Sequence, residues 1–184
     1  MKTFSRLLLS SLFAFALVAP LPASSAAAPV QSDQIGVNGF YSVNRAQRGR
    51  TVQAAVVLDI PRGYHVNANR PLGKYAVPTT VKVDAPRGVR VTPVGYPRGV
   101  VRQLKFSQGE RLALYEGRTV LRFNVTFPAD FPQGVTQLRA RVRFQACTDE
   151  VCYPPATRNL ELPIGVVGAN DPVQRINGRI FGRR

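Results

Sequence analysis

The stretch Leu138-Arg-Ala-Arg-Val-Arg-Phe-Gln-Ala-Cys-Thr-Asp-Glu-Val-Cys-Tyr-Pro-Pro155 joins an alternating segment to both cysteines of the chain. Every second residue from Leu138 to Ala146 is apolar, and arginine fills most positions between them, which indicates a half-buried β-strand. On this alternation, Cys147 is expected on the polar, arginine-bearing face. Pro154 and Pro155 exclude a helix or a central strand just beyond, so the cysteines are expected to flank a short, tight loop.

The rest of the chain shows the same all-β character. Short segments rich in β-branched or alternating residues are separated by turns that contain Pro, Gly and Asp. Strands are expected at residues 51–60, 77–83, 89–94 and 120–127, in the segment that ends at Cys147, and around Leu160, Leu162 and Ile164. No apolar period of 3.6 residues is visible. The pattern therefore predicts a single-domain, all-β, antiparallel β-sandwich.

Residues 1–27 have the composition of a signal peptide. Lys2 and Arg6 accompany the apolar run 7–18, and small residues follow up to Ala28. The apolar run is short for a membrane anchor, so we expect cleavage and a sandwich domain at 28–168 that is periplasmic or otherwise exported and does not span the membrane. The strand pattern lapses after Gly168, and residues 169–184 are expected to form a basic, flexible tail.

The chain is strongly basic, with 25 Lys and Arg against 10 Asp and Glu and a formal net charge of +15. Such an excess is typical of nucleic-acid-binding proteins. The basic residues are, however, not interleaved with aromatic ones that could stack on bases, and an exported protein rarely meets nucleic acid. We therefore expect no nucleic-acid partner, and contact of a basic face or tail with anionic surfaces such as lipid or cell wall, or with an acidic partner.

Two cysteines five positions apart support two interpretations. A disulfide that closes so short a loop removes little entropy from the unfolded chain, about 2 kcal/mol, which favours a redox-active pair over a structural bridge. A structural bridge is nevertheless the usual role of two cysteines in an exported protein. Because His65 is the only histidine, a metal site or a Cys-His protease is weakly supported, and no metal is expected.

The motif Gln145-Ala-Cys-Thr-Asp-Glu-Val-Cys-Tyr-Pro-Pro155, with Gly63-Tyr-His-Val-Asn-Ala-Asn-Arg-Pro71 upstream, resembles the amino-terminal periplasmic domain of the thiol:disulfide interchange protein DsbD. The similarity covers roughly residues 34–167. It implies an immunoglobulin-like fold and a thiol:disulfide oxidoreductase of the protein-disulfide reductase type, without a cofactor. It further implies that Cys152 is the nucleophile that joins the partner and that Cys147 is the resolving thiol. The cysteine spacing is one residue shorter than in the best-known member, which bears on the loop geometry.

In that family, a membrane unit and a thioredoxin-like domain reduce the cysteine pair, which then reduces periplasmic disulfide proteins. Neither unit is found in this sequence. The resemblance therefore implies electron transfer in trans, from a thioredoxin-like donor to periplasmic disulfide proteins. The alternative is a non-catalytic exported β-sandwich that acts as a binding module and holds an inert structural disulfide.

The resemblance also implies that a cap loop shields the cysteines. Residues 102–109 lie in the corresponding place, and Phe106 resembles the shielding aromatic, with Gly109 as a hinge. The other interpretation is that Phe106 is an ordinary core aromatic. His65 resembles a family position near the cysteines that is often aromatic, and its alternative is a half-exposed histidine at a strand end.

Charged residues near the cysteines in sequence have opposing effects on cysteine pKa. Asp149 and Glu150, inside the loop, are expected to raise the pKa of a neighbouring cysteine, and Arg143 and Arg158 to lower it. The sequence does not decide between them. An acidic loop would keep the free thiols protonated until a partner docks. Tyr153, next to the second cysteine in the motif, completes the expected lining of the site.

Overall fold

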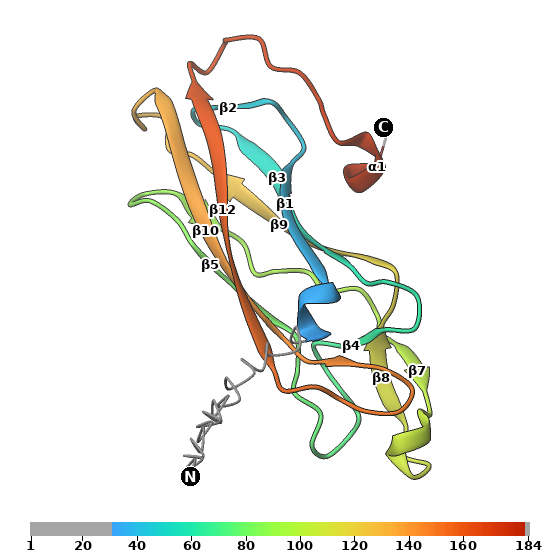
Figure 1. Ribbon diagram of the computed structural model, residues 1–184. Coiled ribbons are helices and arrows are strands. Elements are labelled where there is room, and N and C mark those ends of the chain that lie inside the picture. Colours follow the sequence, from blue (N-terminus) through green and yellow to red (C-terminus); the bar gives the residue numbers. More distant parts are fainter. Residues whose placement is uncertain (1–30, 183–184) are drawn as a thin grey trace, which may run out of the picture.

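The computed structural model describes residues 31–182, and the signal peptide expected at residues 1–27 lies outside them. Two four-stranded sheets pack face to face, and a third, smaller sheet lies at one end (Figure 1). The first sheet has the order β1 (Gly36–Tyr41), β3 (Thr51–Asp59), β9 (Arg118–Thr126), β6 (Arg90–Val91). The second has the order β2 (Arg45–Gln47), β12 (Ala156–Val167), β10 (Gly134–Phe144), β5 (Thr80–Asp84).

The third sheet has the order β11 (Ala146–Cys147), β4 (His65–Asn67), β8 (Leu112–Tyr115), β7 (Val100–Arg102). Three short helices complete the described chain: η1 (Gln31–Gln34), η2 (Lys105–Ser107) and α1 (Gly178–Phe181). Apart from the parallel pair β2–β12, neighbouring strands within the described residues run antiparallel. The prediction of an all-β, immunoglobulin-like antiparallel sandwich is confirmed. None of the helices within residues 31–182 has the length and apolar character needed to cross a membrane.

The core follows the alternation seen in the sequence. In β10, Leu138, Ala140, Val142 and Phe144 are almost completely buried, while the arginines between them are exposed. The apolar residues of β9 occupy the facing layer: Leu121, Phe123 and Val125. Full burial of such side chains stabilises the fold by about 1.5–3 kcal/mol each. This packing makes the sandwich a rigid support for the smaller sheet.

The strand expected to run into Cys147 is interrupted at Gln145. The Gln145 Oε1 accepts hydrogen bonds from Asn67 Nδ2 (2.9 Å) and from the Val77 N–H (3.0 Å). Beyond this point the chain leaves β12 and pairs with β4 instead, with Cys147 opposite His65. Within the third sheet, Cys147 packs with Leu112 and Leu114 of β8 and is fully buried. The expectation that Cys147 shares the exposed, arginine-bearing face is therefore wrong.

The segment after Gly168, for which the sequence indicates a flexible tail, has defined contacts with the first sheet. Arg175 forms a β-bridge with Val43, and Asn177 Nδ2 donates to the Tyr41 carbonyl at 2.8 Å. Ile180 of α1 is only 8% exposed. It packs on an outer-face cluster that includes Ala55, Val57, Phe40 and Val120. The mobility of this segment in solution stays a prediction from the sequence.

Candidate functional site

Cys147 and Cys152 form a disulfide, with their Cα atoms 3.9 Å apart. The two residues face each other across a tight hairpin. Thr148 N donates to the Val151 carbonyl at 2.8 Å, and Tyr153 N donates to the Ala146 carbonyl at 2.9 Å. Because these bonds flank the cysteines, the pair occupies a non-hydrogen-bonded position, where facing residues of an antiparallel ladder come closest. The backbone therefore places the two sulfurs within bonding distance.

The two cysteines differ in exposure. Cys147 is 0% exposed and belongs to an apolar cluster with Leu104, Leu112 and Leu114. Cys152 is partly exposed and lies at the rim of this cluster. An approaching thiolate can therefore reach Cys152, while the protein covers Cys147.

The loop that carries η2, for which the resemblance implies a cap, contributes side chains to the cluster. Leu104 is buried within the cluster, and Phe106 packs against the cluster, as Cys152 does. Lys105 Nζ lies 2.6 Å from Glu150 Oε1 and so joins this cap loop to the cysteine hairpin. The hydrogen bond to Glu150 raises the pKa of Lys105. Because both groups are exposed and screened by water, their ion pair orients the loop without locking it.

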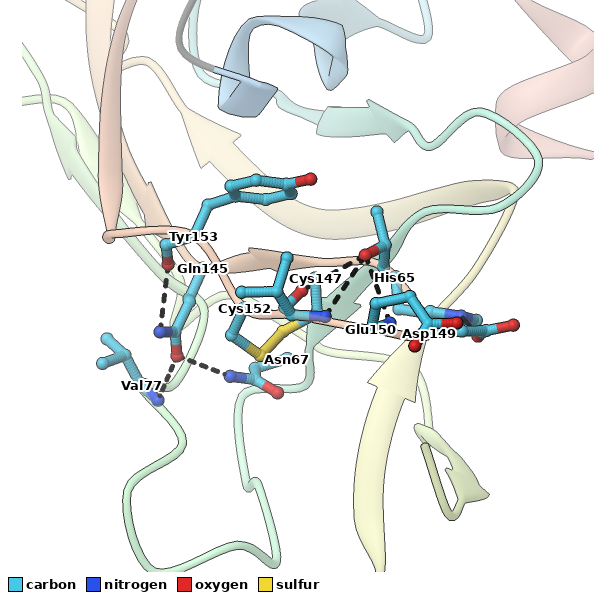
Figure 2. The surroundings of a disulfide bond; sticks show 11 residues. His65, Asn67, Val77, Gln145, Cys147, Asp149, Glu150, Cys152 and Tyr153 are labelled. Atoms are coloured by element: carbon cyan, nitrogen blue, oxygen red, sulfur yellow. Dashed lines mark hydrogen bonds and ion pairs between the residues drawn. A yellow bond between two sulfur atoms is a disulfide. The ribbon is translucent and has the colours of Figure 1, made fainter. Parts of the chain in front are cut away.

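A second set of charges lies along the hairpin side of β4, where His65 sits between two carboxylates. His65 Nε2 is 3.0 Å from Asp149 Oδ1 (Figure 2). His65 Nδ1 is 3.2 Å from Glu116 Oε1, without the geometry of a hydrogen bond. Glu116 also accepts two hydrogen bonds from Arg102, at 3.0 and 3.1 Å, at the start of the cap loop. These groups link β7, β8, β4 and the hairpin tip.

Arg102 controls the charge of Glu116. Its hydrogen bond and positive charge hold the pKa of the Glu116 carboxyl below the usual value, with a smaller contribution from His65. Glu116 therefore stays ionised at pH values where an isolated glutamate is partly protonated. His65 begins β4, so it does lie at a strand end. Its side chain is only 13% exposed, however, and lies between two carboxylates, so it is not the half-exposed histidine of the alternative interpretation.

The structure brings most of the expected site residues together. Four of them lie in the hairpin or next to it. Asp149 and Glu150 form its tip, His65 lies next to Asp149, and Phe106 packs against the cysteine cluster. Tyr153 behaves differently, because it packs against the main core and its ring points away from the disulfide in Figure 2.

The two arginines that were expected to lower the pKa of a cysteine make no hydrogen bond to the cysteine pair within residues 31–182. Arg158 bonds to Asp33 and lies over the Phe144 ring, and Arg143 is exposed on β10. Their positive charge is therefore not directed at the cysteines by these contacts. Lys105 Nζ and His65 Nε2 instead lie next to the two carboxylates of the loop.

Several contacts within the site could not be predicted from the sequence. Gln145 donates from Nε2 to the Tyr153 carbonyl at 3.1 Å and so holds the base of the hairpin. Arg102 and Glu116 are separated by 14 positions, and Lys105 and Glu150 by 45. In the sequence, the opposite charges within each of these two pairs were the one indication that they interact. Within residues 31–182, no group of three or more His, Cys, Asp or Glu side chains is arranged to hold a metal ion.

Comparisons with known proteins give one family and remote structural neighbours. The chain is similar to a chain in the structure of the complex between the DsbD N-terminal and PilB N-terminal domains from Neisseria meningitidis. The identity is 14% and the TM-score 0.39, over 67% of this chain and 80% of that one. It is similar to BcpA, the major pilin subunit of Bacillus cereus, with 11% identity and a TM-score of 0.37, over 72% and 40% of the two chains. No curated protein matches.

The family comparison carries the assignment, because the structural similarities are weak. The model of the family "Thiol:disulfide interchange protein DsbD, N-terminal" matches residues 23–163. The match includes both cysteines, the cap loop and the β4 segment with His65. The chain therefore belongs to the family of the N-terminal domain of the thiol:disulfide interchange protein DsbD.

Proposed function

We propose that this protein is a periplasmic carrier of electrons, which it passes to partner proteins by reversible opening of the Cys147–Cys152 disulfide. The observation that carries the proposal is the asymmetry of the pair, with Cys147 buried and Cys152 partly exposed at the rim of a cluster to which the 102–109 loop contributes Leu104. A purely structural bridge has no need of a cap. Membership of a thiol:disulfide interchange family supports the same conclusion.

In the proposed reaction, the reduced protein reduces a disulfide of its partner. The Cys152 thiolate attacks one partner sulfur, the partner's S–S bond breaks, and its second sulfur leaves as a thiolate. Cys147 then loses its proton and attacks Cys152 Sγ, which breaks the mixed disulfide and releases the partner's first sulfur. Two electrons pass to the partner, which takes up two protons to become a dithiol. The closeness of the cysteines in the hairpin makes the second step intramolecular.

The same steps in reverse reduce the disulfide of this protein again. We propose a thioredoxin-like protein as the donor and disulfide-bonded periplasmic proteins as acceptors, all acting in trans. The donor's thiolate attacks Cys152 of the disulfide, Cys147 leaves, and the donor's second thiol resolves the mixed disulfide. Burial favours the neutral form of a thiol, so Cys147 in its apolar cluster suits the resolving role.

The equilibrium between this disulfide and glutathione tests the proposed function. The oxidised protein is incubated in buffers of graded reduced-to-oxidised glutathione ratio, and its thiols are counted by alkylation and mass spectrometry. A reduction potential above about −300 mV, within the range of exchange proteins, supports the proposal. A lower potential contradicts it and favours the second candidate, a non-catalytic binding module with an inert bridge.

Removal of the Phe106 ring should expose the disulfide. We expect dithiothreitol to reduce the oxidised Phe106→Ala variant about tenfold faster than the parent, because Phe106 packs against the same apolar cluster as Cys152 and its loss opens that cluster to solvent. The rate is followed by quenched alkylation. Phe131→Ala is the control, since Phe131 packs against the main core next to Phe127. Equal rates in the parent and Phe106→Ala proteins would make Phe106 an ordinary packing residue.

A further inference from the structure

A groove of about 710 Å³ lies on the third sheet, on the face opposite the disulfide. Neighbouring residues of a strand point to opposite faces of a sheet. In β8, Leu114 contributes to the cysteine cluster, whereas Ala113 lines the groove. Val101 of β7, which pairs with Ala113, lies on the groove side as well. A molecule bound in the groove therefore leaves Cys152 accessible.

The walls of the groove are basic. Arg70, Arg98 and Arg111 line it, and its lining includes no acidic residue. All three are exposed, and within residues 31–182 none of them has an ion pair. By contrast, Arg102 and Arg118 pair with carboxylates of the chain. Concave surfaces lined by one sign of charge concentrate the field, so the groove is suited to a ligand with several negative charges.

The floor of the groove is apolar. Ala68, Val94, Val101 and Ala113 form part of it. Leu72 also lines the groove and is 57% exposed, although it is a large apolar side chain. Exposed apolar surface of this kind marks binding sites when it is contiguous with a polar rim. A simple inorganic anion would satisfy the arginines and leave this floor uncovered.

We propose that the groove binds an extended segment of a partner protein in which carboxylate and apolar side chains alternate. In such a segment, one set of side chains faces the floor and the other reaches outward to the walls. Arginine forms bidentate bonds with carboxylates. The segment can lie along β7, which is the edge strand of the third sheet. A flat lipid surface cannot reach a concave floor, so a peptide fits better than a membrane. The inference does not depend on exchange at the disulfide.

Binding of a labelled peptide tests the proposal on the full, folded protein. The probe is a fluorescein-labelled octapeptide of alternating Glu and Leu, and fluorescence anisotropy gives its Kd in 150 mM salt. The variant is Arg98→Gln/Arg111→Gln, which removes two wall charges. The matched control is Arg139→Gln/Arg141→Gln, which removes the same charge from the exposed face of β10. We expect the groove variant to weaken binding about tenfold or more and the control to change it less than twofold.

Four outcomes would overturn the proposal. Equal losses in the two double variants would show adsorption through net charge alone. Equal affinity for an octapeptide of alternating Glu and Ser would show a simple anion site without use of the floor. Stronger dependence on Arg98 and Arg111 for anionic phospholipid vesicles than for the peptide would assign the groove to a membrane surface. Failure of the parent protein to bind the Glu-Leu peptide would also contradict it.

Discussion

A Cys147→Ala variant should accumulate mixed disulfides with proteins of the cell envelope, and a Cys152→Ala variant should not. The expected difference follows from access, since Cys152 lies at the rim of the cluster and Cys147 is fully buried beneath the cap loop. Non-reducing gels and mass spectrometry would show and identify the trapped partners. With the purified variants, we expect iodoacetamide to alkylate Cys152 on the order of a hundredfold faster than Cys147.

The unfolded variants provide the control for this comparison. In concentrated guanidinium chloride neither thiol is shielded, and the two alkylation rates should become similar. Equal rates in the folded proteins would remove the structural basis for assigning different roles to the two cysteines. Trapping by Cys152→Ala but not by Cys147→Ala would reverse the assignment of nucleophile and resolving thiol.

An Ile180→Asp variant should lower the free energy of unfolding by about 2–4 kcal/mol. Ile180 is 8% exposed and covers the apolar outer face of the first sheet, where it contacts the cluster that contains Ala55 and Val57. The substitution leaves that face uncovered or buries a charge. Urea denaturation followed by circular dichroism measures the change.

Ile176→Asp is the matched control, because Ile176 lies in the same segment and is 40% exposed. Its effect should stay within about 0.5 kcal/mol. If residues 169–184 formed a free tail, as their sequence indicates, both substitutions would leave the stability unchanged. The disulfide lies on another sheet, so its rate of reduction by dithiothreitol should be the same in both variants.

The central strands could be predicted because one face of each is buried. The alternation of Leu138, Ala140, Val142 and Phe144 appears directly in the burial of β10, and β9 follows the same rule. The strands that the sequence did not reveal lack this signature. In β8, all four residues from Leu112 to Tyr115 are buried, so nothing alternates. β4, β7 and β2 have three residues each, too few for a period to appear.

In the site too, features that depend on residues close in sequence could be predicted, and features that depend on distant residues could not. The hairpin and its cysteines are local, and the resemblance to the family supplied Phe106 and His65. The burial of Cys147 was missed because it depends on the change of partner at Gln145 and on leucines 33 to 43 positions away in the sequence. Likewise, α1 packs through two neighbouring apolar residues, Ile180 and Phe181, in a segment of four. Such a short segment has no periodic pattern from which the contact could be predicted.

The hairpin that holds the cysteines has a consequence for the direction of electron flow. Its two flanking main-chain hydrogen bonds, Thr148 N to Val151 O and Tyr153 N to Ala146 O, do not require the S–S bond. Reduction therefore needs little rearrangement, and the oxidised and reduced molecules present nearly the same surface. A partner therefore cannot distinguish the reduced protein from the oxidised one by the shape of its surface. Under the proposed function, electrons flow from the protein of lower reduction potential to the protein of higher reduction potential, and the relative abundance of donor and acceptor sets the rate.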